Sequence, residues 1–406
     1  MEKRIISEVC TINPPKIVPL SSGEAISFIP MDAVSTDGTV DLVRTISVGQ
    51  IKNYSCFQNG DVLFAKITPC MENGKGAVVS NLQNGYGAGS TEFIVLRPNV
   101  DLLSAKWLFY YFLQKPLRMW LRNHMTGSAG QKRVPPKFLA QQTIPLPPLS
   151  EQQRIVARIE ELFSQLDSGV ETLRKTKQQL AVYRQAVLKE AFEGRLTGSL
   201  PIGEELIGKF IESPRYGTAK KCSYSESAEC IDVYRIPNID YSLGRIDHTD
   251  IKRASFSDSE LVGIQLQPDD ILIIRSNGSA SLVGRAALVR DTDTNATFAG
   301  YLMRLRIKDK ALLFPKYLLL YLQSHSARIY IENKAKSTSG VHNINTKEIA
   351  ALQIPIFDYE DQKIIVEAIE SRLSVCDSIE NTVDVALQQA EALRQSILKD
   401  AFEGRI

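Results

Sequence analysis

The chain repeats part of itself, and this internal repeat constrains the fold more than any other feature of the sequence. The segment Leu188-Lys-Glu-Ala-Phe-Glu-Gly-Arg-Leu196 returns as Leu398-Lys-Asp-Ala-Phe-Glu-Gly-Arg-Ile406, an offset of 210 residues. The offset holds without a gap back to Gly130 and Gly340, and looser matches continue upstream, such as Leu96-Arg97 with Leu305-Arg306. The chain is therefore ordered as domain, helix, domain, helix.

The repeat predicts four segments. They are a globular domain over residues 1–149 (head one), a long helix over 150–197, a second globular domain over 198–356 (head two) and a second long helix over 357–406. A chain of 406 residues is long enough to build two domains with cores of their own. The helical segments resemble each other while the globular segments differ in most side chains, which indicates one duplicated scaffold that carries two different recognition domains.

Apolar residues recur every seven positions in both helical segments. The heptad positions are Ile159, Leu166, Leu173, Leu180 and Val187 in the first copy and Ile369, Cys376, Val383, Ala390 and Ile397 in the second. Sustained heptads indicate a coiled coil, and helices of about 60 Å call for a partner of equal length. Chain connectivity makes the pair antiparallel and gives a pseudo-twofold axis; the alternative is that each helix packs on its own head. Leu162, Tyr183, Ile379 and Leu393 are expected in a second seam, Ser150 as an N-cap, and Gly194 and Gly404 as C-caps.

Both heads are predicted to be α+β. Short β-like runs begin near Asp61, Gly76 and Thr91 in head one and near Asp270, Ala286 and Tyr301 in head two. One amphipathic helix follows in each, over 105–122 and 315–331, and then a small polar loop, over 126–133 and 336–343.

Charge is distributed unevenly, although the net charge is only +2. Residues 102–150 contain no acidic residue, and residues 310–347 contain a single one, Glu332. Local cation excess at matching places of a repeat, beside loops rich in hydrogen-bond donors, indicates DNA binding; an ordinary solvated polar loop is the alternative. The candidate DNA-binding residues are Lys66, Thr68, Asn73, Lys75, Gln131, Lys132, Arg133, Arg275, Ser276, Asn277, Arg285, Lys336, Ser339, His342 and Asn343.

No catalytic motif or metal-ligand spacing stands out in the sequence. Asn13-Pro-Pro-Lys16 resembles the Asn-Pro-Pro-aromatic motif of adenine methyltransferases, but Lys16 cannot stack on a flipped base as an aromatic ring does. The four histidines and six cysteines are scattered, which predicts no metal site and reduced cysteines. With no apolar run of membrane length and no signal peptide, the expected location is cytoplasmic.

Three consecutive features resemble the specificity subunit of type I restriction–modification systems. They are the segment from Ile144 to Val156 (Ile-Pro-Leu-Pro-Pro-Leu-Ser-Glu-Gln-Gln-Arg-Ile-Val), the long helix after it and the closing Glu-Ala-Phe-Glu-Gly-Arg-Leu196. The resemblance covers the full length, with two target-recognition domains and two conserved helical regions in the family order. The second copy is degraded around Phe357-Asp-Tyr-Glu-Asp-Gln362.

The resemblance implies a non-catalytic subunit that recognises a bipartite double-stranded DNA site. It implies two adenine-methylating modification subunits bound at the helical region, and restriction subunits in the full complex. AdoMet, ATP and magnesium would belong to those partners, and none to this chain. Two other classes stay open at this point: a self-contained DNA methyltransferase or nuclease, and a coiled-coil scaffold that does not bind DNA.

Overall fold

The computed structural model describes residues 1–16, 18–41, 43–128, 130–224, 227, 229–335 and 340–406. The chain divides into two compact units, Met1–Arg174 with Asp384–Ile406 (unit one) and Lys175–Val383 (unit two). Two helices are long, α5 (Leu149–Phe192) and α10 (Tyr359–Glu403). Each has one end in unit one and the other end in unit two. Every unit therefore consists of one head and a stretch of both helices.

Head one is built on two sheets with strand orders β2-β9-β6-β7 and β4-β3-β8-β5, and a small β1-β10 pair. Its strands are β1 (Lys3–Ile5), β2 (Cys10–Ile12), β3 (Ala25–Ile29), β4 (Arg44–Ser47), β5 (Ser55–Gln58), β6 (Val62–Ala65), β7 (Gly76–Val78), β8 (Tyr86–Gly89), β9 (Phe93–Pro98) and β10 (Thr143–Pro145). Its helices are α1 (Ile6–Val9), α2 (Ala105–Phe112), α3 (Lys115–Asn123) and α4 (Pro136–Ala140).

Strand β6 lies between two cores, which explains its unbroken apolar sequence. Successive side chains of a strand point to opposite faces. Val62 and Phe64 accordingly pack in the core that contains Trp107 of α2, while Leu63 packs in a second core with Phe57 of the other sheet.

Head two repeats this arrangement with sheets of order β12-β21-β17-β19-β15-β14 and β16-β13-β20, and the small pairs β11-β23 and β18-β22. Its strands are β11 (Gly203–Leu206), β12 (Arg215–Tyr216), β13 (Cys230–Tyr234), β14 (Ile239–Asp240), β15 (Arg245–Ile246), β16 (Lys252–Ser255), β17 (Ile271–Ile274), β18 (Ser276–Asn277), β19 (Ala286–Leu288), β20 (Ala296–Phe298), β21 (Leu302–Leu305), β22 (His342–Asn343) and β23 (Gln353–Ile356). Its helices are α6 (Asp258–Leu261), α7 (Pro315–Gln323), α8 (His325–Lys334) and α9 (Thr346–Ala350). Like β6, β17 is buried on both faces, so both heads are α+β domains of one design.

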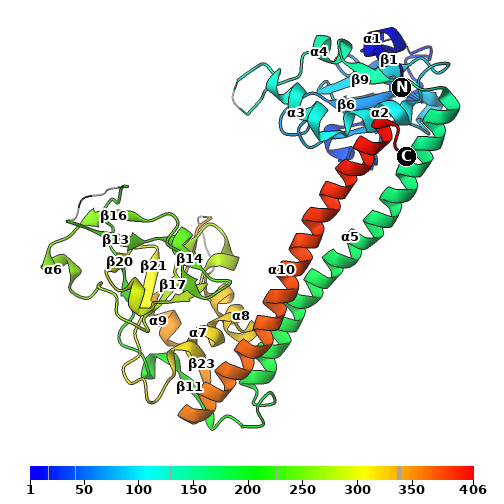
Figure 1. Ribbon diagram of the computed structural model, residues 1–406. Coiled ribbons are helices and arrows are strands. Elements are labelled where there is room, and N and C mark those ends of the chain that lie inside the picture. The colour runs from blue at the N-terminus through cyan, green and yellow to red at the C-terminus, as the bar shows by residue number, and fades with distance from the viewer. Residues whose placement is uncertain (17, 42, 129, 225–226, 228, 336–339) are drawn as a thin grey trace. The chain divides into compact units, whose positions relative to one another are not determined.

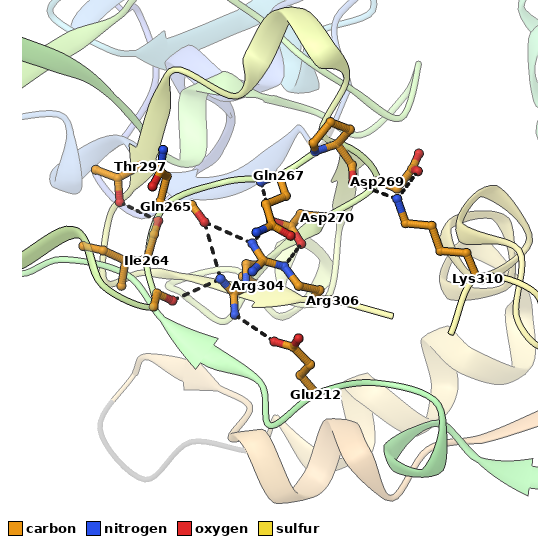
Figure 2. Close-up of polar contacts among 12 residues, drawn as sticks. Glu212, Ile264, Gln265, Gln267, Asp269, Asp270, Thr297, Arg304, Arg306 and Lys310 are labelled. Carbon is orange, nitrogen blue, oxygen red and sulfur yellow. Dashed lines mark hydrogen bonds and ion pairs between the residues drawn. The ribbon is translucent and has the colours of Figure 1, made fainter. Parts of the chain in front are cut away.

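A buried ion pair explains one of the weaker repeat matches. In head one, Arg97 donates two hydrogen bonds of 2.8 Å to Asp61, whose side chain is 1 % exposed. In head two, Arg306 donates two hydrogen bonds of 2.7 Å to Asp270, also 1 % exposed, as Figure 2 shows. A buried carboxylate must be paired and hydrogen-bonded, so this aspartate and this arginine recur together.

A buried glutamine attaches the start of each long helix to its head. Gln152 donates to the carbonyl oxygens of Leu102 and Pro147 (2.8 Å each) and accepts a hydrogen bond from the Ser104 N–H (2.9 Å). Gln362 makes the equivalent contacts with Leu312, Phe357 and Phe314. The side-chain amide satisfies backbone groups that would otherwise be buried without partners, which is why the glutamine occurs in both copies.

Helices α5 and α10 run antiparallel within each unit. In unit one Asp167 pairs with Arg394 and Arg154 with the Ile406 carbonyl oxygen, so residue numbers rise along one helix as they fall along the other. In unit two Arg184 pairs with Asp377 at 2.5 Å, the same arginine–aspartate combination one repeat apart. The predicted heptad residues all lie in the seam: they are buried except Leu166 and Leu173, which are half-buried.

The last turn of each long helix completes the core of a head. In unit one the C-terminal end of α10, red in Figure 1, reaches α2, where the Phe402 ring lies 4.2 Å from that of Trp107. In unit two the Phe192 ring of α5 lies 5.2 Å from that of Tyr317 of α7. The backbone then turns at Gly194 and Gly404, with φ of 79° and 78°, which confirms both as C-caps.

Three expectations about the helices were wrong. The single helix expected in each head is two helices, because Pro116 interrupts the first and an extended Ser324 caps the second part of the other; further short helices are also present. Ser150 is not an N-cap, since α5 begins at Leu149 and the Pro148 carbonyl oxygen already accepts from the Gln152 N–H. The expected second seam is largely exposed at Tyr183, Ile379 and Leu393, because a helix with one partner buries one stripe.

Candidate nucleic-acid interface

Two candidate segments of head one that are far apart in the sequence lie side by side in the fold. The Val134 N–H donates to the Lys66 carbonyl oxygen (2.9 Å), and the Thr68 N–H donates to that of Lys132 (3.0 Å). The Lys132 N–H also donates to Thr68 Oγ1 at 3.1 Å. Residues 66–68 and 131–134 thus form a short antiparallel ribbon, here called the first ribbon, which brings together Lys66, Thr68, Gln131, Lys132 and Arg133 of the predicted set.

Head two has the same ribbon at the equivalent place. Strands β18 and β22 pair Ser276 with Asn343 and Asn277 with His342, and the Ile344 N–H donates to the Arg275 carbonyl oxygen at 2.9 Å. Residues 275–277 and 342–344, the second ribbon, correspond to the first through the repeat. Of the predicted set, Lys336 and Ser339 lie outside the residues that the structure describes.

The two ribbons share a backbone arrangement but present different side chains. Lys132 and Gln131 are exposed on the first, where Arg133 forms an ion pair with Glu92 at 2.7 Å. On the second, Asn343 is exposed, and the Arg275 guanidinium lies 4.2 Å from the centre of the Tyr216 ring. These are the donors that contact phosphates and base edges in protein–DNA complexes.

The remaining candidates do not belong to the ribbons. Lys75 donates to the Met31 carbonyl oxygen at 2.7 Å, which gives it a structural contact. Asn73 lines a cavity of about 980 Å³ between head one and the helices, together with Arg118 and Arg394. Arg285 lies over the Tyr241 ring at 5.0 Å and donates to the Ser281 carbonyl oxygen.

Sequence reasoning missed Glu92, Tyr216 and Tyr301 beside the ribbons. The Lys66 N–H donates to the Glu92 carbonyl oxygen, and the Arg275 N–H donates to that of Tyr301, each at 2.9 Å. Glu92 and Tyr301 are therefore equivalent positions, and the Tyr301 side chain is 64 % exposed. The Leu96-Arg97 and Leu305-Arg306 match places them in register, so extending that alignment a few residues upstream could have identified them.

Much of the predicted cation excess is neutralised by acidic residues from other segments. Lys106 pairs with Glu160 at 2.6 Å, and its repeat equivalent Lys316 pairs with Glu370 at 2.5 Å. Lys310 pairs with Asp269 at 2.6 Å. The excess of cations counted along the sequence therefore overstates the positive charge at these places in the folded heads.

The structure also brings together a histidine and a carboxylate that the sequence did not suggest. His248 Nε2 lies 2.9 Å from Asp293 Oδ1 in head two. The Asp293 carboxylate also accepts hydrogen bonds from the Arg290 N–H (2.8 Å) and guanidinium (3.2 Å). Burial opposes its ionisation, but the hydrogen bonds from Arg290 and His248 hold the pKa of Asp293 below its usual value. The carboxylate therefore serves to close a turn.

The described residues contain neither a metal-ion cluster nor a membrane-spanning helix. Within this part of the chain, no three histidine, cysteine or acidic side chains come together as a metal-ion site. Across the same ranges, no helix is both long enough and apolar enough to span a membrane.

Comparison with known proteins places this architecture in a family. Residues 1–180 and 263–389 match the family model described as type I restriction modification DNA specificity domain. The type I restriction enzyme EcoKI specificity subunit of Escherichia coli strain K12 is 30 % identical over 321 residues, 77 % of this chain and 68 % of that protein. The EcoAI specificity subunit of Escherichia coli is 40 % identical over 201 residues, which are 49 % of this chain and only 33 % of that relative.

Solved structures agree on the fold. A chain from work on complex assembly and conformational transition of the type I R-M system superposes with a TM-score of 0.79 at 20 % identity, covering 100 % of this chain and 98 % of that one. The HsdS subunit from Thermoanaerobacter tengcongensis gives a TM-score of 0.55 at 20 % identity, covering 100 % and 97 %. Because the family model matches well over half of the residues, the chain belongs to the type I restriction–modification DNA specificity family.

Proposed function

We propose that this chain recognises DNA sequence as the specificity subunit of a type I restriction–modification complex, and that each head reads one half of a bipartite site. The observation that carries this proposal is the pair of ribbons, which have one backbone design and different side chains. Two readers of different half-sites need a shared scaffold with different hydrogen-bonding groups. Membership of the specificity family supports the same function.

The paired helices are proposed to set the spacer between the half-sites and to bind two adenine-methylating modification subunits. Restriction subunits would join these in the full complex. AdoMet, ATP and Mg²⁺ are assigned to the partner subunits, and no residue of this chain is given a catalytic role. A self-contained methyltransferase or nuclease is not favoured, since the relatives are specificity subunits.

The first test is a map of modified bases in the host genome with and without the gene. We expect a gapped motif with methylated adenine in each half to disappear on deletion. If no gapped motif depends on the gene, binding of the purified chain with its modification subunits to a duplex library decides the question. Absence of sequence-selective binding there would contradict the proposal.

The role of the helices is tested by deleting one heptad from both α5 and α10. Seven residues are about 10.5 Å of helix, which corresponds to about three base pairs at about 3.4 Å each. The preferred spacer should therefore shorten by about three base pairs while both half-sites stay the same. An unchanged spacer in a folded variant would rule out the helices as the determinant, and deletion from one helix alone is the control for a broken seam.

A further inference from the structure

Arg133 of the first ribbon is held by hydrogen bonds to two partners and still reaches solvent. Its Nε and Nη2 atoms donate to the Glu92 carboxylate at 2.9 and 2.7 Å, and Nη1 donates to the Gln131 carbonyl oxygen at 3.0 Å. The Arg133 side chain is 42 % exposed and that of Glu92 is 25 % exposed. The guanidinium is therefore oriented before any ligand arrives.

The donors left on Arg133 suit a base edge. A guanidinium has five N–H groups, and three are used in these contacts, which leaves two for a ligand. Two donors of one guanidinium match the O6 and N7 acceptors of guanine in the major groove. Because the side chain is already immobilised, binding costs less conformational entropy than it would for a free arginine.

The neighbouring charge argues against a phosphate contact. Hydrogen bonds from Arg133 lower the pKa of Glu92, so this carboxylate is charged at neutral pH. Arg133 and Glu92 together then carry no net charge, so this guanidinium attracts a phosphate group less than an unpaired arginine would, whereas a base edge is neutral. The positive charge that remains near the pair is that of Lys66, which also favours the charged form of Glu92. The adjacent Lys132 is exposed and is the better phosphate ligand on this ribbon.

We propose that Arg133 reads a guanine in the half-site of head one and that Glu92 is its positioning residue. The inference rests on the proposed function and specifies the base that is read, the residue that reads it and the residue that positions that arginine. At the equivalent places head two has Asn343 and Tyr301. Asparagine pairs with adenine rather than guanine, so the two heads would differ in the base read at this point.

The test uses the full chain assembled with its modification subunits and a DNA duplex library randomised across both half-sites. We expect Arg133→Ala and Arg133→Lys to reduce the preference for guanine at one position by about 5- to 150-fold, the range of a lost bidentate contact. Lysine cannot form this contact despite its charge. Preferences at the other positions should not change.

Lys132→Ala is the matched control, one residue away on the same ribbon. It should weaken binding to all sequences, keep the base preferences and reduce the slope of affinity against salt by about one. Glu92→Gln should reduce discrimination at the same single position as the Arg133 variants while the midpoint of thermal unfolding stays near that of the parent. A purely structural Glu92 would change stability instead.

Two results would overturn the inference. One is a uniform loss of affinity in both Arg133 variants, as for Lys132→Ala, which would make Arg133 a phosphate contact. The other is an unchanged base preference at every position in folded Arg133→Lys protein. Failure of the parent complex to select any sequence would be a different outcome, because it would refute the proposed function and this inference with it.

Discussion

Phe402→Ala should destabilise head one although Phe402 lies near the C-terminal end of the chain. Its side chain is buried, and its ring lies 4.2 Å from that of Trp107 and 5.5 Å from that of Tyr111. Burying a phenylalanine is worth about 1.5–3 kcal/mol, and each aromatic contact adds about 0.5–1.5 kcal/mol. The expected loss is about 3–5 kcal/mol, in line with other Phe→Ala changes in cores.

Hydrogen exchange measured by mass spectrometry is the appropriate assay, because two units need not unfold together and one global transition would hide a local effect. A loss of this size should lower the protection of α2 and β6 by about 150- to 5,000-fold. Peptides from β17 and α7 of head two should exchange at the parent rate.

Phe192→Ala is the matched control, one repeat earlier. Its ring lies 5.2 Å from that of Tyr317 and 5.1 Å from that of Tyr321, so it should lower protection in head two and leave head one unchanged. If Phe402→Ala raised exchange equally in both heads, or in neither, the assignment of the end of α10 to the core of head one would be wrong.

Further changes test two interactions that recur in the repeat and one that is specific to head two. Arg394→Asp removes the ion pair with Asp167 and also the contact of the guanidinium with the Phe163 ring, 4.4 Å away. Asp167→Arg in the same chain should restore the ion pair, so a double-mutant cycle should give a coupling energy under about 1 kcal/mol, typical of partly exposed pairs. A coupling energy of zero would show that the two side chains do not interact. Gln152→Leu leaves three backbone groups, one buried and two partly buried, without their partners and should cost about 2 kcal/mol in the local stability of head one. Gln362→Leu should act in head two, and equal effects of either change on both heads would contradict the assigned contacts. Asp293 has a lowered folded-state pKa, so its stabilising contribution is present above about pH 4 and is lost as the pH falls through the folded value. Asp293→Asn should therefore flatten the acid-induced loss of protection in head two, and an unchanged acid profile would count against this role.

The helices could be predicted from the sequence because their information is local. A seven-residue apolar repeat indicates a pairing stripe whatever surrounds it, and Gly194 and Gly404 mark the ends through a backbone conformation that glycine adopts readily. The prediction was wrong where the apolar periodicity of a helix conflicted with a proline. Pro116 removes a backbone donor within the expected helix, and the chain forms two helices there.

The candidate interface was only partly predictable. The residue types of the ribbons indicated DNA, but contacts between Thr68 and Lys132, 64 positions apart, depend on packing that no local pattern encodes. The partner of Lys106 was likewise not predictable: the sequence analysis included Lys106 in the cation excess, whereas Glu160 neutralises its charge in the fold. The repeat alignment could place Glu92 opposite Tyr301, but its role depends on Arg133 lying beside it, which only the fold shows.

The sequence by itself determined the duplication, the two long helices, the α+β character of the heads and the family resemblance. All of these are written in short-range patterns and in the fixed offset between copies. Only the tertiary structure decided which segments meet: the two strands of each ribbon, the buried Asp61–Arg97 pair and the closure of head one by Phe402. These contacts join residues distant in the chain, and they form because burial of apolar surface and pairing of buried polar groups are satisfied for the folded unit as a whole.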